Sequence, residues 1–209
     1  YKALVQADGR LLVSGVSMST ATKAALCRFM PDGAIDTSFG GQPSNPGCYV
    51  SEQDDSFAWD LAVQNDGKIV ATVDLFSPSP TQAAILRLTA SGAPDVTFSD
   101  DGYAVLPNAN HLRSLAVAKD GKLVAGGWHF SSPPFGNADF YVARIEPEQG
   151  ALDTSFNNGT GEFIVGYDLG TTSLTKDDAV FDLKTLNDGS ILLAGKADIG
   201  VTSADRSTL

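Results

Sequence analysis

An internal repeat limits the folds open to this chain. The dipeptide Asp-Gly ends four similar apolar segments, at Asp8, Asp66, Asp120 and Asp188. These aspartates are separated by 58, 54 and 68 residues, so the repeat averages 60 residues. A second motif, Asp-x-Ser/Thr-Phe, recurs with spacings of 59 and 58 residues and begins at Asp36, Asp95 and Asp153. Two motifs that recur in step indicate one structural unit copied along the chain.

Each unit contains four segments with strand character. In the second unit, runs rich in Val, Ile, Leu and Ala lie at 60–64, 68–74, 83–89 and 103–106. Asp-Gly predicts a tight hairpin between the first two, because Gly adopts positive φ at little cost. No segment keeps a 3.6-residue apolar period long enough for a helix. The pattern predicts an all-β protein of short antiparallel strands.

Repeated units of four antiparallel strands are typical of β-propeller blades. Runs such as Ile85-Leu86 are apolar on both faces, as a blade between two neighbours requires. We predict an all-β β-propeller with about three and a half blades in this chain, part of a ring of about seven. The predicted units are 1–57, 58–111, 112–178 and a partial unit at 179–209. The remaining blades would come from the same longer chain or from a second copy. A β-sandwich and an open β-solenoid are the alternative folds.

The order of the motifs resembles a known repeat. A strand, Asp-Gly-Lys, a strand and Ala-Gly are followed by x-x-Ala-Arg-x and then by Gly-x-x-Asp-Thr-Ser-Phe. This order is similar to the delta-60 repeat family of bacterial, often exported proteins, over Ala3 to about Ala197. Two departures are Val96, where Thr is usual, and one extra residue within 146–150. The resemblance implies the propeller fold and transfers no catalytic residue.

The net charge of the chain restricts its partners. Lys plus Arg number 14 and Asp plus Glu number 25, which gives a formal net charge of −11. Nucleic acids and anionic membranes bind basic surfaces, so neither is expected as a partner. The apolar run 191–194 is far shorter than the ~20 residues of a membrane-spanning helix, so no membrane insertion is expected. The acidic, Lys-poor composition favours a secreted or cell-surface protein.

Three arginines recur at a fixed distance before the second motif. They precede its aspartate by 8, 8 and 9 residues, which predicts one ion pair per blade between the third strand and the turn into the fourth. The expected pairs are Arg28–Asp36, Arg87–Asp95 and Arg144–Asp153. We interpret the phenylalanines of the motif as structural wedges between blades. They are Phe39, Phe98 and Phe156.

Loops at one rim of the propeller are the candidate ligand-binding surface. The loops at 16–23, 76–82 and 130–138 differ in length and composition while the strands keep their pattern, as expected where loops carry function. The candidate binding residues are Asp54, Asp55, His111, His129, Asp177 and Asp178. Both histidines are expected on the same rim. An ordinary solvated loop position is the alternative for all six.

Two pairs of neighbouring residues are candidate calcium ligands. Asp100-Asp101 and Asn157-Asn158 occupy equivalent places in their blades, and calcium requires six to eight converging oxygens. The D-x-D-x-D-G spacing is missing, so turn chemistry is the alternative. No other cofactor is predicted.

The two cysteines are candidates for a disulfide. Cys27 falls on the predicted third strand and Cys48 opens the fourth strand of the same blade. Adjacent antiparallel strands bring such residues within bonding range. Two reduced cysteines are the alternative. Without C-x-x-C or a Cys/His cluster, a zinc site is not expected.

These patterns favour a non-enzymatic role. The sequence contains no G-x-S-x-G motif and no P-loop. The leading hypothesis is a rigid extracellular or cell-surface platform whose loops bind a protein or a glycan. A polysaccharide hydrolase or lyase with acidic residues near the propeller channel is one alternative, and a structural module of a larger assembly is another. An enzyme should bring titratable residues together in a deep pocket, whereas a platform should show a shallow, mixed surface.

Overall fold

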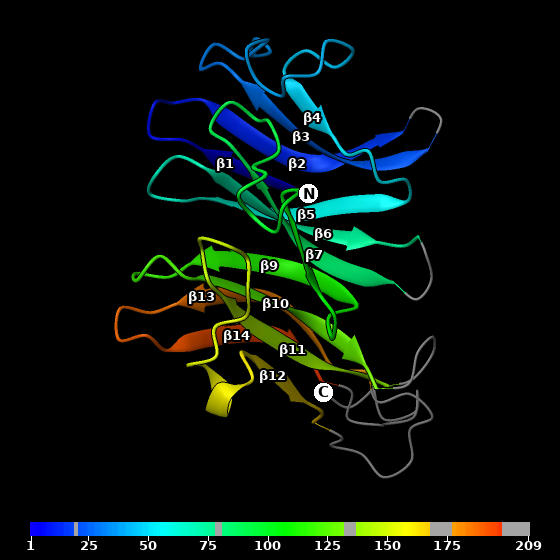
Figure 1. The fold of residues 1–209 in the computed structure, drawn as a ribbon, viewed down its shortest axis with the longest axis vertical. Coiled ribbons are helices and arrows are strands. Elements are labelled where there is room, and N and C mark those ends of the chain that lie inside the picture. The colour runs from blue at the N-terminus through cyan, green and yellow to red at the C-terminus, as the bar shows by residue number, and fades with distance from the viewer. Residues whose placement is uncertain (19–20, 78–80, 132–136, 168–176, 198–209) are drawn as a thin grey trace, which may run out of the picture.

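The computed structural model describes residues 1–18, 21–77, 81–131, 137–167 and 177–197. Within these ranges the chain forms three four-stranded antiparallel sheets and one two-stranded sheet, which follow one another along the molecule (Figure 1). Parts of the predicted variable loops and residues 198–209 of the fourth predicted unit lie outside the described residues. The described part holds no helix long and apolar enough to cross a membrane.

The strands of each sheet are hydrogen-bonded in chain order. The first sheet contains β1 (Lys2–Val5), β2 (Leu11–Met18), β3 (Thr22–Phe29) and β4 (Cys48–Val50). The second contains β5 (Ser56–Val63), β6 (Ile69–Leu75), β7 (Gln82–Leu88) and β8 (Tyr103–Leu106). The third contains β9 (His111–Val117), β10 (Leu123–Phe130), β11 (Ala138–Ile145) and β12 (Glu162–Val165). The fourth contains β13 (Ala179–Thr185) and β14 (Ile191–Lys196).

These sheets confirm the predicted all-β class and its four-stranded units. The unit boundaries predicted after residues 57 and 111 fall one or two residues inside β5 and β9. A 3-10 turn at Asn157–Gly159 is the only helical segment in the described ranges.

The four Asp-Gly hairpins have the same local structure. In each, the aspartate accepts a hydrogen bond from the backbone N–H two residues later, at 2.9–3.1 Å. The following glycine has a φ between 83° and 88°, a region that other residues enter only with strain. All four hairpins project from one side of the molecule, on the left in Figure 1. The repeat in the sequence is therefore a repeat in space.

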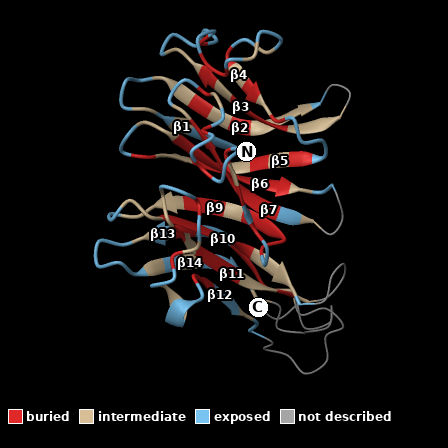
Figure 2. Cartoon of the chain, in the orientation of Figure 1, coloured by how far each residue is buried: buried red, intermediate tan, exposed pale blue. Residues whose placement is uncertain are grey.

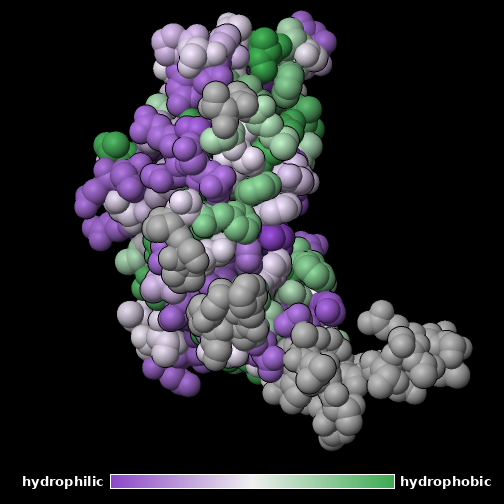
Figure 3. All heavy atoms as spheres, turned by 90° about the vertical axis from the view of Figure 1, so that its right-hand side faces the viewer, coloured by the Kyte–Doolittle hydropathy of each residue, from purple (hydrophilic) through white to green (hydrophobic). Residues whose placement is uncertain are grey.

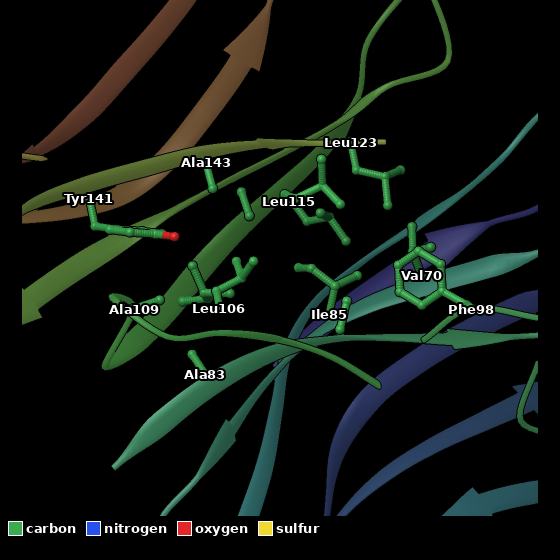
Figure 4. Close-up of a cluster of buried hydrophobic side chains, with 14 residues drawn as sticks. Val70, Ala83, Ile85, Phe98, Leu106, Ala109, Leu115, Leu123, Tyr141 and Ala143 are labelled. Atoms are coloured by element: carbon green, nitrogen blue, oxygen red, sulfur yellow. The ribbon is translucent and has the colours of Figure 1, made fainter. Parts of the chain in front are cut away.

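The core consists of layers between successive sheets. Ile85 belongs to a cluster between the second and third sheets, whereas its neighbour Leu86 belongs to the cluster between the first and second. Side chains alternate between the faces of a strand, so the apolar runs supply both layers. Figure 2 shows buried residues along the strands of the inner sheets, and Figure 4 shows the layer between the second and third sheets. This is the packing of propeller blades.

A disulfide joins Cys27 and Cys48, whose Cα atoms are 4.1 Å apart. The two residues are register partners in β3 and β4. Since β4 has only three residues, the bond fastens the shortest strand of the first sheet to its neighbour.

Candidate functional site

The recurring arginines and aspartates form one ion pair in each complete blade. The Nε to Oδ2 distances are 2.8 Å for Arg28–Asp36, 2.9 Å for Arg87–Asp95 and 2.5 Å for Arg144–Asp153. The second pair is an ion pair without a well-aligned hydrogen bond between these two atoms. Each guanidinium also lies over the ring of its motif phenylalanine, 4.4–5.2 Å from the centroid. These contacts tie the third strand to the turn before the fourth strand.

A second cation, which the sequence reasoning missed, completes each pair. Arg10, Lys68 and Lys122 lie 3.5, 3.2 and 3.1 Å from the aspartates of their own blades. The signal was present, because these residues directly follow the Asp-Gly dipeptide in the three units that contain the second motif. In the fourth copy of the hairpin, Ser190 stands at this position.

The three aspartates are held ionised. Burial alone would raise the pKa of Asp95, but the hydroxyl and backbone N–H of Thr97, with Lys68 and Arg87, outweigh it and hold this pKa at about 2. Burial acts on Asp153 in the same direction and is also outweighed, so its pKa is lowered. A hydrogen bond from the Ser38 hydroxyl is the largest influence on Asp36, whose pKa is lowered as well.

Acid is expected to destabilise the fold through these carboxylates. A folded-state pKa below the unfolded value contributes stability that is present above the unfolded pKa and is lost as the pH falls through the folded one. The free energy of unfolding should therefore decline between about pH 4 and about pH 2. Urea unfolding across this range measures the decline, and Asp95→Asn should make it shallower. Asp66→Asn, at an exposed hairpin, is the control, and an equal slope in the wild type and Asp95→Asn would contradict the assignment.

The same motif joins the first blade to the second and the second blade to the third. Arg28 Nη1 donates to the carbonyl of Ala90, in the turn that follows β7 of the second blade, at 2.7 Å. Arg87 donates to the carbonyls of Pro147 and Glu148 in the turn that follows β11. Phe39 and Phe98 are buried in the layers between sheets. Phe156 packs at the edge of the layer between the third and fourth sheets and is only partly buried.

The acidic rim candidates lie in two separate connections between sheets. Asp54 pairs with Lys23 at 2.9 Å, and Asp55, with a φ of 49°, accepts a hydrogen bond at its carbonyl. Asp177 and Asp178 accept backbone hydrogen bonds from the third sheet and from the chain that follows it. Each pair thus takes part in ordering its own connection.

The two histidines have different surroundings. His129 Nδ1 lies 2.7 Å from the carbonyl of Asn108. His111 is buried at the start of β9, and its Nδ1 lies 2.9 Å from Oδ2 of Asp74. The structure therefore brings His111, but not the acidic candidates, into a larger cluster.

The calcium candidates occupy strained turns. Asp100, Asn157 and Asn158 have positive φ, and the Asp101 side chain accepts a hydrogen bond from the Tyr103 N–H at 2.8 Å. Throughout the described ranges, no three His, Cys, Asp or Glu side chains are grouped so that they could hold a metal ion.

Asp74 is the centre of a buried polar cluster. Its side chain is fully buried in β6, and Oδ2 accepts from Trp59 Nε1 at 2.7 Å and Arg113 Nη1 at 2.6 Å and lies 2.9 Å from His111 Nδ1. Oδ1 accepts the N–H of Leu112 at 3.0 Å. Hydrogen bonds to a carboxylate are strong when the group is shielded from water, so this cluster is held rigidly.

The guanidinium of Arg113 lies between two tryptophan rings. Its Cζ is 3.8 Å from the centroid of Trp59 and 4.5 Å from that of Trp128. Because Asp74 neutralises Arg113 and the rings cover its faces, this arginine is fixed in one orientation.

The large residues of the cluster occupy equivalent positions in the repeat. Seven residues before each hairpin aspartate stand Tyr1, Trp59, Arg113 and Phe181. In the second, third and fourth sheets this position coincides with a register shift in the first strand. A β-bulge redirects a side chain out of the regular pleat, and it does so here in three successive blades.

Neighbouring aromatic rings, mostly in tilted or edge-to-face contact, extend the cluster into what we call the aromatic surface. It comprises Tyr1, Phe57, Trp59, Phe76, Trp128 and Phe181, with Arg113 among them. Neighbouring rings, with His111 as one link, have centroids 4.5–6.4 Å apart. Tyr1 is 64% exposed and Phe181 53% exposed. Figure 3 faces the side on which β6 and β10 end, and there hydrophobic residues form small groups among hydrophilic ones. Such a surface can bind a ligand by stacking.

The comparisons with known proteins agree with this architecture. A family model described as a beta-propeller domain of unknown function, DUF5122, matches residues 6–39, 64–98 and 118–156, which make up about half of the chain. Each match begins near an Asp-Gly hairpin and ends on the phenylalanine of the second motif. No curated protein and no solved structure matches the chain significantly. On these three matches, the chain belongs to the DUF5122 beta-propeller family.

Proposed function

We propose that this chain is a non-enzymatic binding module of an exported propeller protein, and that its ligand is a glycan bound on the aromatic surface. The observation that carries the proposal is the partly exposed row of rings organised around Asp74, Arg113 and the two tryptophans. Flat ring faces that are already ordered bind the apolar face of a sugar with little loss of conformational freedom. We also propose that the units are delta-60 repeats.

Polar groups beside the rings support a glycan ligand. A row of polar residues crosses the first strands, one residue after the positions of Tyr1, Trp59, Arg113 and Phe181. It consists of Lys2, Asp60, Ser114 and Asp182. Lys2 Nζ lies 3.3 Å from Asp60, and the Ser114 hydroxyl lies 3.3 Å from Asp60 and 3.1 Å from Asp182. Asp60 and Ser114 are buried and order this row, whereas Lys2 and Asp182 are exposed. An exposed ammonium and an exposed carboxylate next to aromatic rings provide the mixture of stacking and hydrogen bonding that sugars require.

Two further properties support the proposed export of the protein and the proposed class of ligand. The disulfide is typical of proteins that fold in an oxidising compartment. The net charge of −11 disfavours nucleic acid and anionic membrane surfaces as ligands.

Binding of soluble polysaccharides tests the proposal. Titration calorimetry with a panel of neutral and acidic polysaccharides should find at least one ligand, and Phe76→Ala with Phe181→Ala should weaken its binding by about tenfold or more. Phe163→Ala, which removes a partly exposed ring outside the aromatic surface, is the matched control and should keep the wild-type affinity. If no polysaccharide binds, the ligand class is wrong. If binding survives the double substitution, the surface is wrong.

A further inference from the structure

His111 uses only one of its two ring nitrogens within the described part of the protein. Its side chain is 11% exposed, and its Nδ1 lies 2.9 Å from Oδ2 of the fully buried Asp74. Its Nε2 makes no hydrogen bond with any described residue. Polar atoms of buried side chains are nearly always hydrogen-bonded, to the protein or to what lies against it. The free nitrogen is therefore a position at which a ligand atom can bond.

The imidazole is surrounded by aromatic rings. The ring centroids of Phe76, Trp128 and Phe130 lie 5.5, 4.7 and 5.8 Å from that of His111. In the described part of the chain, the buried side-chain atoms that lack a partner belong to other residues, so Nε2 is not closed off from solvent. The imidazole thus presents this nitrogen beside the rings of the aromatic surface.

The contact with Asp74 decides which nitrogen carries the hydrogen. Oδ2 of Asp74 already accepts from Arg113 at 2.6 Å and from Trp59 at 2.7 Å, and an ionised carboxylate can only accept. Nδ1 of His111 therefore bears the hydrogen that lies between it and Oδ2. In a neutral imidazole with its hydrogen on Nδ1, Nε2 is an acceptor. The aromatic surface thus offers one unoccupied hydrogen-bond acceptor.

The charges beside the imidazole disfavour an acidic ligand. Arg113 is paired with Asp74 at 2.6 Å, and Lys2 is paired with Asp60 at 3.3 Å. Asp182 is exposed, and within the described residues it accepts from a hydroxyl and a backbone N–H but has no cationic partner. This group of three carboxylates and two cations has one negative charge in excess. A ligand that carries carboxylate or sulfate groups would be repelled by it.

We propose that the ligand of the aromatic surface is an uncharged polysaccharide, and that one of its hydroxyl groups donates a hydrogen bond to Nε2 of His111. This inference rests on the proposed function and narrows it. A sugar can place its apolar face on a ring while a hydroxyl at its edge donates to a neighbouring nitrogen. An acidic chain also has hydroxyl groups, but each of its carboxylates meets the excess negative charge and finds no donor at Nε2. His111 is then the residue that determines specificity.

Matched polysaccharides test this selectivity in the whole chain. Hydroxyethyl cellulose and carboxymethyl cellulose share one backbone, as do methyl-esterified and de-esterified pectin, and in each pair only the second is acidic. Both pairs are added to the panel of polysaccharides, and calorimetry is done at about pH 8, where an ordinary imidazole is neutral. The ligands that bind tightest should be neutral, and a neutral chain should bind about tenfold more tightly than its acidic counterpart. Added salt should reduce the difference.

Two substitutions of His111 separate its two nitrogens. His111→Asn keeps an amide that can donate to Asp74 but has no atom at the place of Nε2, and it should weaken binding of the neutral polysaccharide by about tenfold. His111→Gln carries its amide oxygen closer to the place of Nε2 and should recover part of the affinity. If His111 acted only by holding Asp74, the order of the two variants would be reversed, and that order would overturn the proposal.

Nitrogen NMR of the imidazole tests the wild-type protein directly, whether or not these variants fold. At about pH 8 the free protein should show an Nε2 without a proton, and its signal should shift on saturation with the neutral polysaccharide. The charged groups that face the imidazole are Asp74 of β6 and Arg113 of β9, since the rings around it are uncharged. A proton on Nε2, or a signal that does not move, would overturn the assignment.

Failure of this inference and failure of the proposed function give different results. If an acidic polysaccharide binds tightest and Phe76→Ala with Phe181→Ala abolishes its binding, the surface is right and the inference is wrong. Equal affinity for both members of each pair would also overturn the inference. If no polysaccharide binds, both proposals fail. Phe163→Ala, outside the aromatic surface, is the control and should keep the wild-type preference.

Discussion

Asp74→Ala is expected to lower the free energy of unfolding by about 3–5 kcal/mol. The substitution leaves Arg113 as an uncompensated, largely shielded charge, and it leaves the indole of Trp59 and the N–H of Leu112 without their acceptor. Removing one partner of a buried ion pair costs the desolvation of the group that stays behind. Because β5, β6 and β9 all supply groups to this cluster, the second and third blades should loosen together.

Urea unfolding followed by tryptophan fluorescence measures this effect directly. The chain has two tryptophans, and Trp59 and Trp128 both lie against Arg113, so the native signal itself should change. Asp54→Ala removes an exposed aspartate with one ion pair and should stay within about 0.5 kcal/mol of the wild type. A loss below about 1 kcal/mol for Asp74→Ala would show that the cluster is not held by its carboxylate.

The repeating part of this fold could be predicted from sequence because its contacts join residues that lie near one another within one unit. Asp8 accepts a hydrogen bond from the N–H two residues later, and Arg28 meets an aspartate eight residues away. Such short-range contacts recur whenever the unit is copied, and they fix turns and strand order. The alternation of Ile85 and Leu86 between two layers was readable for the same reason.

The aromatic surface could not be predicted in the same way, because it is not a property of one unit. Asp74 has no equivalent in the other blades, where Val16, Trp128 and Lys196 stand at the same place in the repeat. Its donors come from β5 and β9, and only the spacing between blades brings them together. Aligning the residues seven before each hairpin aspartate would have revealed the row of large side chains, although not the bulge that turns them outward.

The acidic rim candidates illustrate the opposite difficulty. Acidic pairs in a loop are conspicuous in a sequence, but their placement depends on backbone groups that composition does not reveal. Asp177, for example, accepts the N–H of Ala138 across the junction of two sheets. A residue that recurs in every unit can be recognised from the repeat, whereas a residue that occurs once cannot. Asp74 occurs once, and it organises the candidate site.

Arg87→Ala is expected to destabilise the chain by about 3–5 kcal/mol, and Arg144→Ala by only about 1 kcal/mol. The Arg87 side chain is 1% exposed and contacts Asp95, Thr97, the carbonyls of Pro147 and Glu148, and the ring of Phe98. Its removal leaves two carbonyls of the third blade without this donor and opens a cavity beside Phe98.

Arg144 is a matched control, since it has the same motif and its side-chain contacts among the described residues lie within its own blade. The side chain of Arg144 is partly exposed, and Lys122 remains 3.1 Å from Asp153 after its removal. Urea unfolding of both variants under the same conditions gives the comparison. Equal losses would mean that the stability of the motif comes from the ion pair within one blade. A loss several times larger for Arg87→Ala would locate it in the carbonyl contacts to the next blade, and that linkage makes each blade depend on its neighbour.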